Sequence, residues 1–323
     1  VWSFTSTNLS PELYSYNLIL DGVKIVDPGS VYITRDITSE TNIFILSDKK
    51  GDCGDLYTVN EVPHGNVSKV WYDSPTLKMQ RRMTVYTPAG YDKGKDYPVL
   101  YLLHGAGGDE DAWTTLGRAQ HILDNLIATG KAKPMVVVMT NGNPNCQAAP
   151  GEWSAGQYIP SFYGYQGAKP AATMDESFPD VMNYVESHYK VAKDKAHRAI
   201  CGLSMGGGHS FDISRRFPTK FDYIGLFSAG LHVGTTGDFR SDFYKQLQGN
   251  EEAKTQLATL FKNKPKLYWI GMGKTDFLYK SSADLRRYFD EKGYKYTYLE
   301  TEGGHIWRNW RVYLTEFAQK IFK

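Results

Sequence analysis

The chain has 323 residues, of which 41% are hydrophobic and 22% charged, a composition typical of globular domains and not of disordered or membrane proteins. Lysine and arginine total 37 against 35 aspartates and glutamates, and no dense basic block is present, so nucleic acid is not an expected partner. No apolar run approaches the roughly 20 residues of a membrane-spanning helix, so we expect no membrane partner either.

Three cysteines, Cys53, Cys146 and Cys201, lack any C-x-x-C spacing. The sequence therefore predicts neither a zinc cage nor a disulfide framework. The chain starts Val1-Trp2-Ser3 without a methionine or a signal-peptide pattern, so we expect a processed or trimmed product.

Strand signals dominate the first region, up to about Tyr86. Tyr14, Tyr16, Leu18 and Leu20 occupy every second position over residues 14–20, the period of a half-buried strand. Asp21-Gly22 is a turn signal between this strand and residues 23–26, which predicts a β-hairpin. Residues 43–46 predict a further strand.

Residues 47–55 collect Asp, Lys and Gly without periodicity and are predicted to be a loop or linker. We therefore expect a domain boundary near residues 48–66. This divides the chain into a β region, residues 1–62, and a larger second domain, residues 63–323.

Short apolar runs alternate with amphipathic segments beyond Pro98. The runs are typical of strands buried on both faces, and Phe178 to Val185 and Trp310 to Ile321 repeat at helical steps. This alternation predicts an α/β domain with a mostly parallel sheet. The apolar runs cover residues 99–103, 135–139, 199–201, 224–227, 267–270 and 296–299.

The segment Gly202-Leu203-Ser204-Met205-Gly206 matches G-x-S-x-G, a strained strand-to-helix turn that exposes a nucleophilic serine. Chance predicts roughly 0.2 such matches in a chain of this composition, so the context decides. A short apolar run precedes the motif and a helical segment follows it. We predict Ser204 as the nucleophile; the alternative is a glycine-rich helix start that only packs against the sheet.

α/β-Hydrolases order their catalytic residues as serine, acid, histidine. Asp276 follows the apolar run 267–270, at the strand end where ligand sites gather, and His305 follows the last predicted strand. We predict Asp276 as the acid and His305 as general base and acid. A solvated loop aspartate and a surface-loop histidine are the alternatives, and Asp284, Asp290, Glu300 and Glu302 compete for the acid role.

Two backbone amides are predicted to bind the oxyanion. One belongs to Met205, directly after the serine, and the other to Ala106 in His104-Gly105-Ala106-Gly107-Gly108, which is similar to the HGGG-type loop. For His104 we expect a structural hydrogen bond, because no carboxylate or cysteine spacing accompanies it as a metal site would require. We expect no metal and no cofactor.

Candidate substrate contacts come from two further loops. Trp153 lies in an aromatic, glycine-broken segment that runs to Tyr165 and suits the wall of a cleft, although a surface loop packed on itself fits equally well. Leu231 follows the run ending at Phe227 and is a second candidate for the pocket.

Together, residues 86–91, residues 101–108 and residues 202–207 resemble carbohydrate esterase family 1. The likeness covers roughly residues 68–323 and implies an α/β-hydrolase fold with a Ser-His-Asp triad. The first region resembles a family 48 carbohydrate-binding module through Leu13 to Tyr16, Asp21-Gly22 and Asp27-Pro28. This second likeness implies a partial immunoglobulin-like β-sandwich, for which we rank bracing of the catalytic domain above glycan binding.

The resemblance implies a secreted or periplasmic feruloyl esterase that releases ferulic or related hydroxycinnamic acids from arabinoxylan. Its partner would be feruloylated or acetylated plant cell-wall polysaccharide or oligosaccharide. One alternative keeps the triad but changes the ester to an acetyl, siderophore-type or thiol ester. A second alternative is a noncatalytic glycan-binding protein.

Overall fold

The structure is a computed structural model that describes residues 5–6, 9–156, 158–159, 170–234 and 242–323 of the chain. Strands dominate its first part, and strands alternate with helices in the rest. The strands are β1 (Glu12–Tyr16), β2 (Leu18–Leu20), β3 (Val23–Ile25), β4 (Ile33–Asp36), β5 (Ser39–Leu46), β6 (Asn66–Ser74), β7 (Met79–Thr87), β8 (Val99–Leu103), β9 (Val136–Thr140), β10 (Arg198–Leu203), β11 (Tyr223–Phe227), β12 (Leu267–Gly273) and β13 (Thr297–Thr301). The helices are α1 (Cys53–Tyr57), α2 (Ala112–Thr115), α3 (Ala119–Ala128), α5 (Met174–His188), α6 (Met205–Arg216), α7 (Phe243–Gln248), α8 (Glu251–Lys262), α9 (Tyr279–Lys292) and α10 (Trp307–Ala318).

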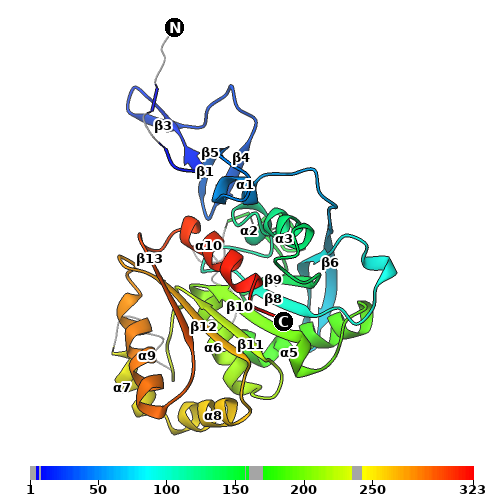
Figure 1. Cartoon of the computed structure of the whole chain (residues 1–323), viewed down its shortest axis with the longest axis vertical. Helices are drawn as coiled ribbons and strands as arrows, with labels where there is room; N and C mark the ends of the chain where they lie inside the picture. Colours follow the sequence, from blue (N-terminus) through cyan, green and yellow to red (C-terminus); the bar gives the residue numbers. More distant parts are fainter. Residues whose placement is uncertain (1–4, 7–8, 157, 160–169, 235–241) are drawn as a thin grey trace.

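An eight-stranded sheet forms the centre of the molecule, in the order β13-β12-β11-β10-β8-β9-β7-β6 (Figure 1). Neighbouring strands from β13 to β9 are all parallel, whereas β7 runs antiparallel to β9 and to β6. The predicted mostly parallel α/β sheet is therefore confirmed. Because parallel strands end at the same edge, the loops after β8, β10, β12 and β13 gather there.

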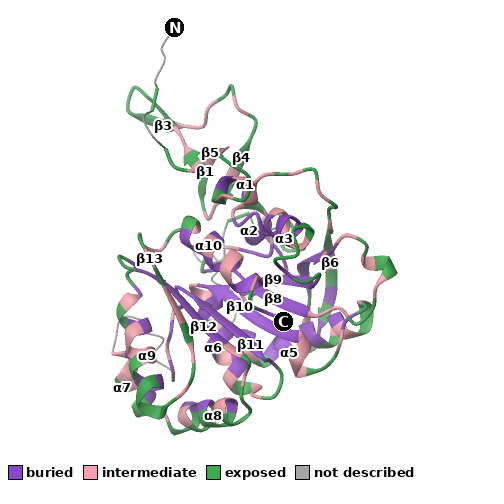
Figure 2. Ribbon diagram, viewed as in Figure 1, coloured by how far each residue is buried: buried purple, intermediate pink, exposed green. Residues whose placement is uncertain are grey.

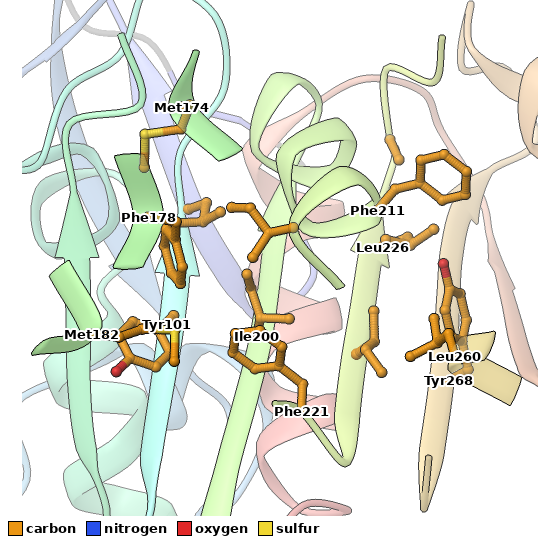
Figure 3. Packing of buried hydrophobic residues seen from close by; sticks show 14 of the residues in the cluster. Tyr101, Met174, Phe178, Met182, Ile200, Phe211, Phe221, Leu226, Leu260 and Tyr268 are labelled. Atoms are coloured by element: carbon orange, nitrogen blue, oxygen red, sulfur yellow. The ribbon is translucent and has the colours of Figure 1, made fainter. Parts of the chain in front are cut away.

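Both faces of the sheet are buried at the central strands β8, β9 and β11, which explains why these strands are almost entirely apolar (Figure 2). Tyr101 and its alternate neighbours in β8 pack with α5 and α6, while Leu100 and Leu102 pack with α3 and α10. On the first face, the ring of Tyr101 meets that of Phe178 edge-on, with 5.1 Å between centroids (Figure 3). The strand ends that carry the site thus project from a densely packed layer.

The first part of the chain forms a small antiparallel sheet, β1-β5-β4, and a separate hairpin of β2 and β3. The predicted hairpin is confirmed, since Leu20 pairs with Val23 across Asp21-Gly22. The single strand predicted over residues 14–20 is wrong, because β1 ends at Tyr16 and β2 belongs to another pairing. At the break, the Asn17 side chain donates a hydrogen bond of 3.0 Å to the Glu40 carbonyl. These strands support a partial immunoglobulin-like sandwich only weakly.

One further prediction about the first region needs correction. The predicted loop 47–55 contains the start of α1, which the Asp52 side chain caps by accepting a hydrogen bond from the Asp55 amide. Strands β6 and β7, which the predicted boundary already places in the second domain, belong to the large sheet through the pairing of β7 with β9. The division at residues 62 and 63 stays a prediction.

Cys53 and Cys201 are free cysteines. Within the part of the chain that the structure describes, no helix is both long enough and apolar enough to span a membrane.

Candidate active site

Ser204 occupies the sharp turn between β10 and α6. Its backbone has φ 52° and ψ −114°, a strained conformation for a residue other than glycine. The surrounding structure holds it there: the Ser204 amide donates to the Phe227 carbonyl at 2.9 Å, and the Ser204 carbonyl accepts from Gly208 and Gly230 at 3.0 and 2.8 Å. This is the strand, turn and helix that the G-x-S-x-G motif predicts.

Glycine is required in the first turn of α6 because the backbone of β8 passes very close. A Cβ atom on Gly206 would lie 2.5 Å from the carbonyl oxygens of both Leu103 and His104. No side chain can rotate away to relieve this contact, since both neighbours are backbone atoms. The close approach brings the end of β8 next to the nucleophile.

Replacing Gly206 by alanine should therefore lower the free energy of unfolding by about 1–3 kcal/mol, the usual range for overpacking, and reduce ester hydrolysis. Urea unfolding and initial rates measure the two effects. Gly249→Ala is the matched control, because its nearest contact would be the Lys245 carbonyl at 3.4 Å. Equal stability of the two variants would contradict the prediction.

His305 and Asp276 form a direct pair across the loops that follow β13 and β12. Nδ1 of His305 lies 2.9 and 3.1 Å from the two carboxylate oxygens, and the Asp276 side chain is completely buried. Asp276 also accepts a hydrogen bond of 2.9 Å from the Leu278 amide. This pairing engages Nδ1 and leaves Nε2 as the ring nitrogen available to a substrate or nucleophile.

Each competing carboxylate has a different partner. Asp284 pairs with Lys280 and Glu302 with Lys274, whereas Asp290 and Glu300 accept hydrogen bonds from tyrosine hydroxyls. Of the candidate acids, the described structure therefore brings Asp276 to the histidine.

A cavity of about 1190 Å³ connects these groups. Ser204, His305, Gly105 and Ala106 all line it, together with residues of the first β-sheet. Asp276 lies behind His305 and does not reach the cavity surface. The structure thus brings the predicted nucleophile, base and oxyanion loop to one space, although they are far apart in the sequence.

The two predicted oxyanion donors have free N–H groups. Among the described residues, neither the Ala106 amide nor the Met205 amide has a hydrogen-bond acceptor. Met205 begins α6, where the amides point out of the helix and the dipole favours negative charge. Ala106 lines the cavity, whereas Met205 directly follows the cavity residue Ser204 and is not itself part of the lining; the role of the two amides as oxyanion donors stays a prediction.

His104 supports the oxyanion loop, which we define as residues 104–108. Its Nδ1 lies 2.7 Å from the Gly105 carbonyl, and its Nε2 accepts a hydrogen bond of 2.7 Å from the Gly142 amide. Burial lowers the pKa of His104, which favours a neutral ring with its proton on Nδ1. No group of three potential metal ligands occurs among the described residues.

His209, in α6, is a partly buried histidine whose Nδ1 is shielded from solvent, and burial lowers its pKa to about 4. In the unfolded chain the same histidine has an ordinary pKa near 6.5, so between pH 6.5 and pH 4 the unfolded chain binds a proton at this position and the folded chain does not. The free energy of unfolding should therefore be highest above pH 6.5 and fall as the pH drops toward 4, by about 2 kcal/mol at pH 4.5.

Urea unfolding at pH 7 and pH 4.5 tests this effect. Between these two pH values the free energy of unfolding of His209→Gln should fall by about 2 kcal/mol less than that of wild type. Substitution of the exposed His188 by glutamine should leave the wild-type loss unchanged. An identical acid loss in wild type and His209→Gln would contradict the prediction.

The structure does not bring Trp153 or Leu231 to the cavity. Trp153 is buried against Cys146 and Ala148 and donates its indole N–H to the Ala148 carbonyl, so its ring is used in packing the loop itself. Leu231 is only 1% exposed and belongs to the core. The aromatic residues Phe162, Tyr163 and Tyr165 of the same loop lie outside the described residues.

Sequence reasoning missed two groups at the cavity. Trp307 lines it, and so does the turn formed by Ile37 and Thr38. No local motif marks that turn, because its place at the site depends on how the first sheet packs on the second domain.

Residues 74–321 match a family model described as "Putative esterase". A relative named Endo-1,4-beta-xylanase/feruloyl esterase, from Xylanibacter ruminicola, is 32% identical over the whole chain, which spans 40% of that relative's length. An acetyl esterase from Caldicellulosiruptor saccharolyticus is 23% identical over 78% of this chain and 90% of its own.

Solved structures agree on the fold. A carbohydrate esterase family 1 ferulic acid esterase from Anaeromyces mucronatus, solved with ferulic acid, matches with a TM-score of 0.62 and 24% identity over 84% of this chain and 96% of its own. The α/β-hydrolase fold is thus confirmed, and the family model and the relative at 32% identity confirm the resemblance to esterases of the feruloyl esterase group, while the carbohydrate-binding-module likeness stays a prediction. Because the esterase model matches most of the sequence, the chain belongs to the esterase family.

Proposed function

We propose that this chain is a serine carboxylic ester hydrolase that releases ferulic or related hydroxycinnamic acids from arabinoxylan. The observation that carries the proposal is the shared cavity: Ser204, His305 and Ala106 line it, and Asp276 holds the histidine from behind. This is the arrangement that acyl transfer through a serine requires.

In the first half of the reaction, Ser204 Oγ attacks the ester carbonyl while Nε2 of His305 takes its proton. The carbonyl oxygen gains negative charge and accepts hydrogen bonds from the amides of Ala106 and Met205. Such donors supply a large share of catalysis, because they are already oriented toward the charge that develops. His305 then protonates the departing sugar alcohol, and an acyl-serine remains.

In the second half, water replaces the alcohol. His305 removes a proton from the water, the resulting hydroxide adds to the acyl carbonyl, and His305 returns the proton to Ser204 Oγ as the acid leaves. Asp276 stabilises the positively charged imidazole in both halves and keeps its own charge.

The choice of acyl group rests on the relatives. The full-length relative at 32% identity is named a feruloyl esterase, which favours hydroxycinnamates on plant cell-wall polysaccharide. The acetyl esterase relative favours acetate as the second candidate. Because such a polysaccharide is found outside cells, we also propose a secreted or periplasmic location.

A substrate panel tests the proposal. Methyl ferulate and a feruloylated arabino-oligosaccharide should be hydrolysed with a higher kcat/KM than acetylated xylan. A preference for acetylated xylan would replace the hydroxycinnamoyl ester by the acetyl ester as the substrate. If neither ester is cleaved, both substrate assignments are wrong.

A further inference from the structure

The turn between β4 and β5 lines the same cavity as Ser204. Asp36 pairs with Ser39, so Ile37 and Thr38 form a two-residue turn that lines the cavity. Ile37 has a φ of 56°, which β-branched residues rarely adopt. Two-residue hairpin turns normally place glycine, asparagine or aspartate at positive φ. Local turn preference therefore does not explain the isoleucine.

The Ile37 side chain packs directly on the oxyanion loop. A Cβ atom on Gly107 would lie 3.0, 3.1 and 3.2 Å from Cγ2, Cγ1 and Cδ1 of Ile37, so these atoms cover the glycine backbone. Two residues earlier in the loop, a Cβ atom on Gly105 would lie 3.3 Å from Cβ of Ser204. A continuous line of contacts thus runs from the turn through the loop to the nucleophile.

An ion pair holds the turn in this position. Arg35 contacts the Asp109 carboxylate at 2.5 Å, and the Asp109 side chain is only 3% exposed. Arg35 also donates a hydrogen bond of 2.8 Å to the carbonyl of Ile37. Because Asp109 directly follows the oxyanion loop, Arg35 connects the turn to the end of that loop.

The same small sheet also contacts the helix that follows His305. Burial raises the pKa of Asp36, and an interaction with the side chain of Trp307, the first residue of α10, opposes that rise. In β1, the buried Glu12 pairs with Arg311 of α10 at 3.1 Å. The first sheet is therefore tied to both loops on which the proposed chemistry depends.

We propose that the β4–β5 turn is a positioning element of the active site, in which Ile37 holds the oxyanion loop against Ser204 and keeps the Ala106 amide directed at the reacting carbonyl. This inference rests on the proposed function for the role of the loop. It assigns the first β region a part in catalysis beyond bracing. It also explains the strained isoleucine, because glycine in its place would leave Gly107 uncovered.

Ile37→Gly tests the proposal, because glycine relieves the positive φ and removes only the contact. We expect kcat on methyl ferulate to fall about 10- to 100-fold with KM changed less than about 3-fold, as for a displaced oxyanion donor. Ile37→Val keeps both γ carbons and should retain most of the wild-type kcat. A wild-type kcat in Ile37→Gly would overturn the proposal, and so would a change confined to KM.

Lys78→Gly is the matched control. Lys78 has the same φ of 56° and an exposed side chain in the turn between β6 and β7, and it does not line the cavity, so this variant should keep the wild-type kcat. An equal loss in both glycine variants would overturn the proposal. If Ile37→Gly does not fold, Ile37→Ala gives the same comparison without a change of backbone freedom.

A fluorophosphonate separates this proposal from the assignment of the acyl group. Its phosphoryl oxygen occupies the oxyanion site during attack by serine, so inactivation of Ile37→Gly should slow in parallel with kcat. If the wild-type protein is inactivated but does not cleave ferulate esters, the feruloyl assignment is wrong. The inactivation rates of wild type and Ile37→Gly still test the role of the turn in that case. A normal inactivation rate in Ile37→Gly would overturn it.

Discussion

Replacing Ser204 by alanine should lower kcat on the preferred ester by a factor on the order of 10⁶, as expected when the nucleophile of a triad is removed. The oxygen that forms the acyl intermediate is then absent, while the cavity and the oxyanion amides remain. Initial rates with wild type and variant at equal concentration give the ratio.

Folding and labelling separate this loss from a structural defect. Alanine at position 204 keeps the backbone partners of the turn, namely the Phe227 carbonyl and the Gly208 and Gly230 amides, so the circular dichroism spectrum should match wild type. A fluorophosphonate should label wild type and leave Ser204→Ala unlabelled. Full activity in the variant would remove the mechanism, and unlabelled wild type would favour a noncatalytic glycan-binding protein.

Asp276→Asn should lower kcat/KM by a factor on the order of 10⁴, because it reverses the tautomer of His305. The asparagine oxygen can still accept from the Leu278 amide, as the carboxylate does at 2.9 Å. Its NH₂ group then faces Nδ1, which must accept a hydrogen bond, so the proton moves to Nε2. A ring protonated on Nε2 cannot take the proton of Ser204.

Asp284→Asn is the matched control for this substitution. Asp284 was a competitor for the acid role, but it pairs with Lys280 at 2.8 Å on α9, so its neutralisation should change kcat/KM less than about 2-fold, in keeping with the small energy of an exposed ion pair. A larger loss in Asp284→Asn than in Asp276→Asn would contradict the assignment of the acid.

Much of the candidate site follows from local sequence signals. The elbow around Ser204 is readable because a strained turn between a strand and a helix requires glycines at fixed distances. Asp276 and His305 are predictable because each follows a buried apolar run, and parallel strands bring their carboxyl ends to one edge. The structural hydrogen bonds of His104 are also predictable, because the loop after β8 must keep a fixed shape and the sequence around His104 has no metal-ligand spacing.

The errors lie where long-range packing overrides local pattern. The single strand expected over residues 14–20 is divided between two pairings, because β1 pairs with β5 and β2 pairs with β3. Trp153 lies in a segment whose composition suits a cleft wall, yet its indole N–H donates a hydrogen bond to the Ala148 carbonyl within its own loop. Local sequence carries no information about which partner a strand or ring will find at a distance.

The sequence by itself determined the candidate nucleophile, the order of the candidate acid and histidine after it, and the parallel sheet that brings them together, because glycine spacing and apolar runs encode backbone geometry directly. Only the tertiary structure decided what closes the other side of the cavity. The contact of Ile37 with Gly107 joins residues about 70 positions apart in the chain, and its turn even opposes local preference. Such a contact depends on the packing of two separate sheets, which no pattern within either one specifies.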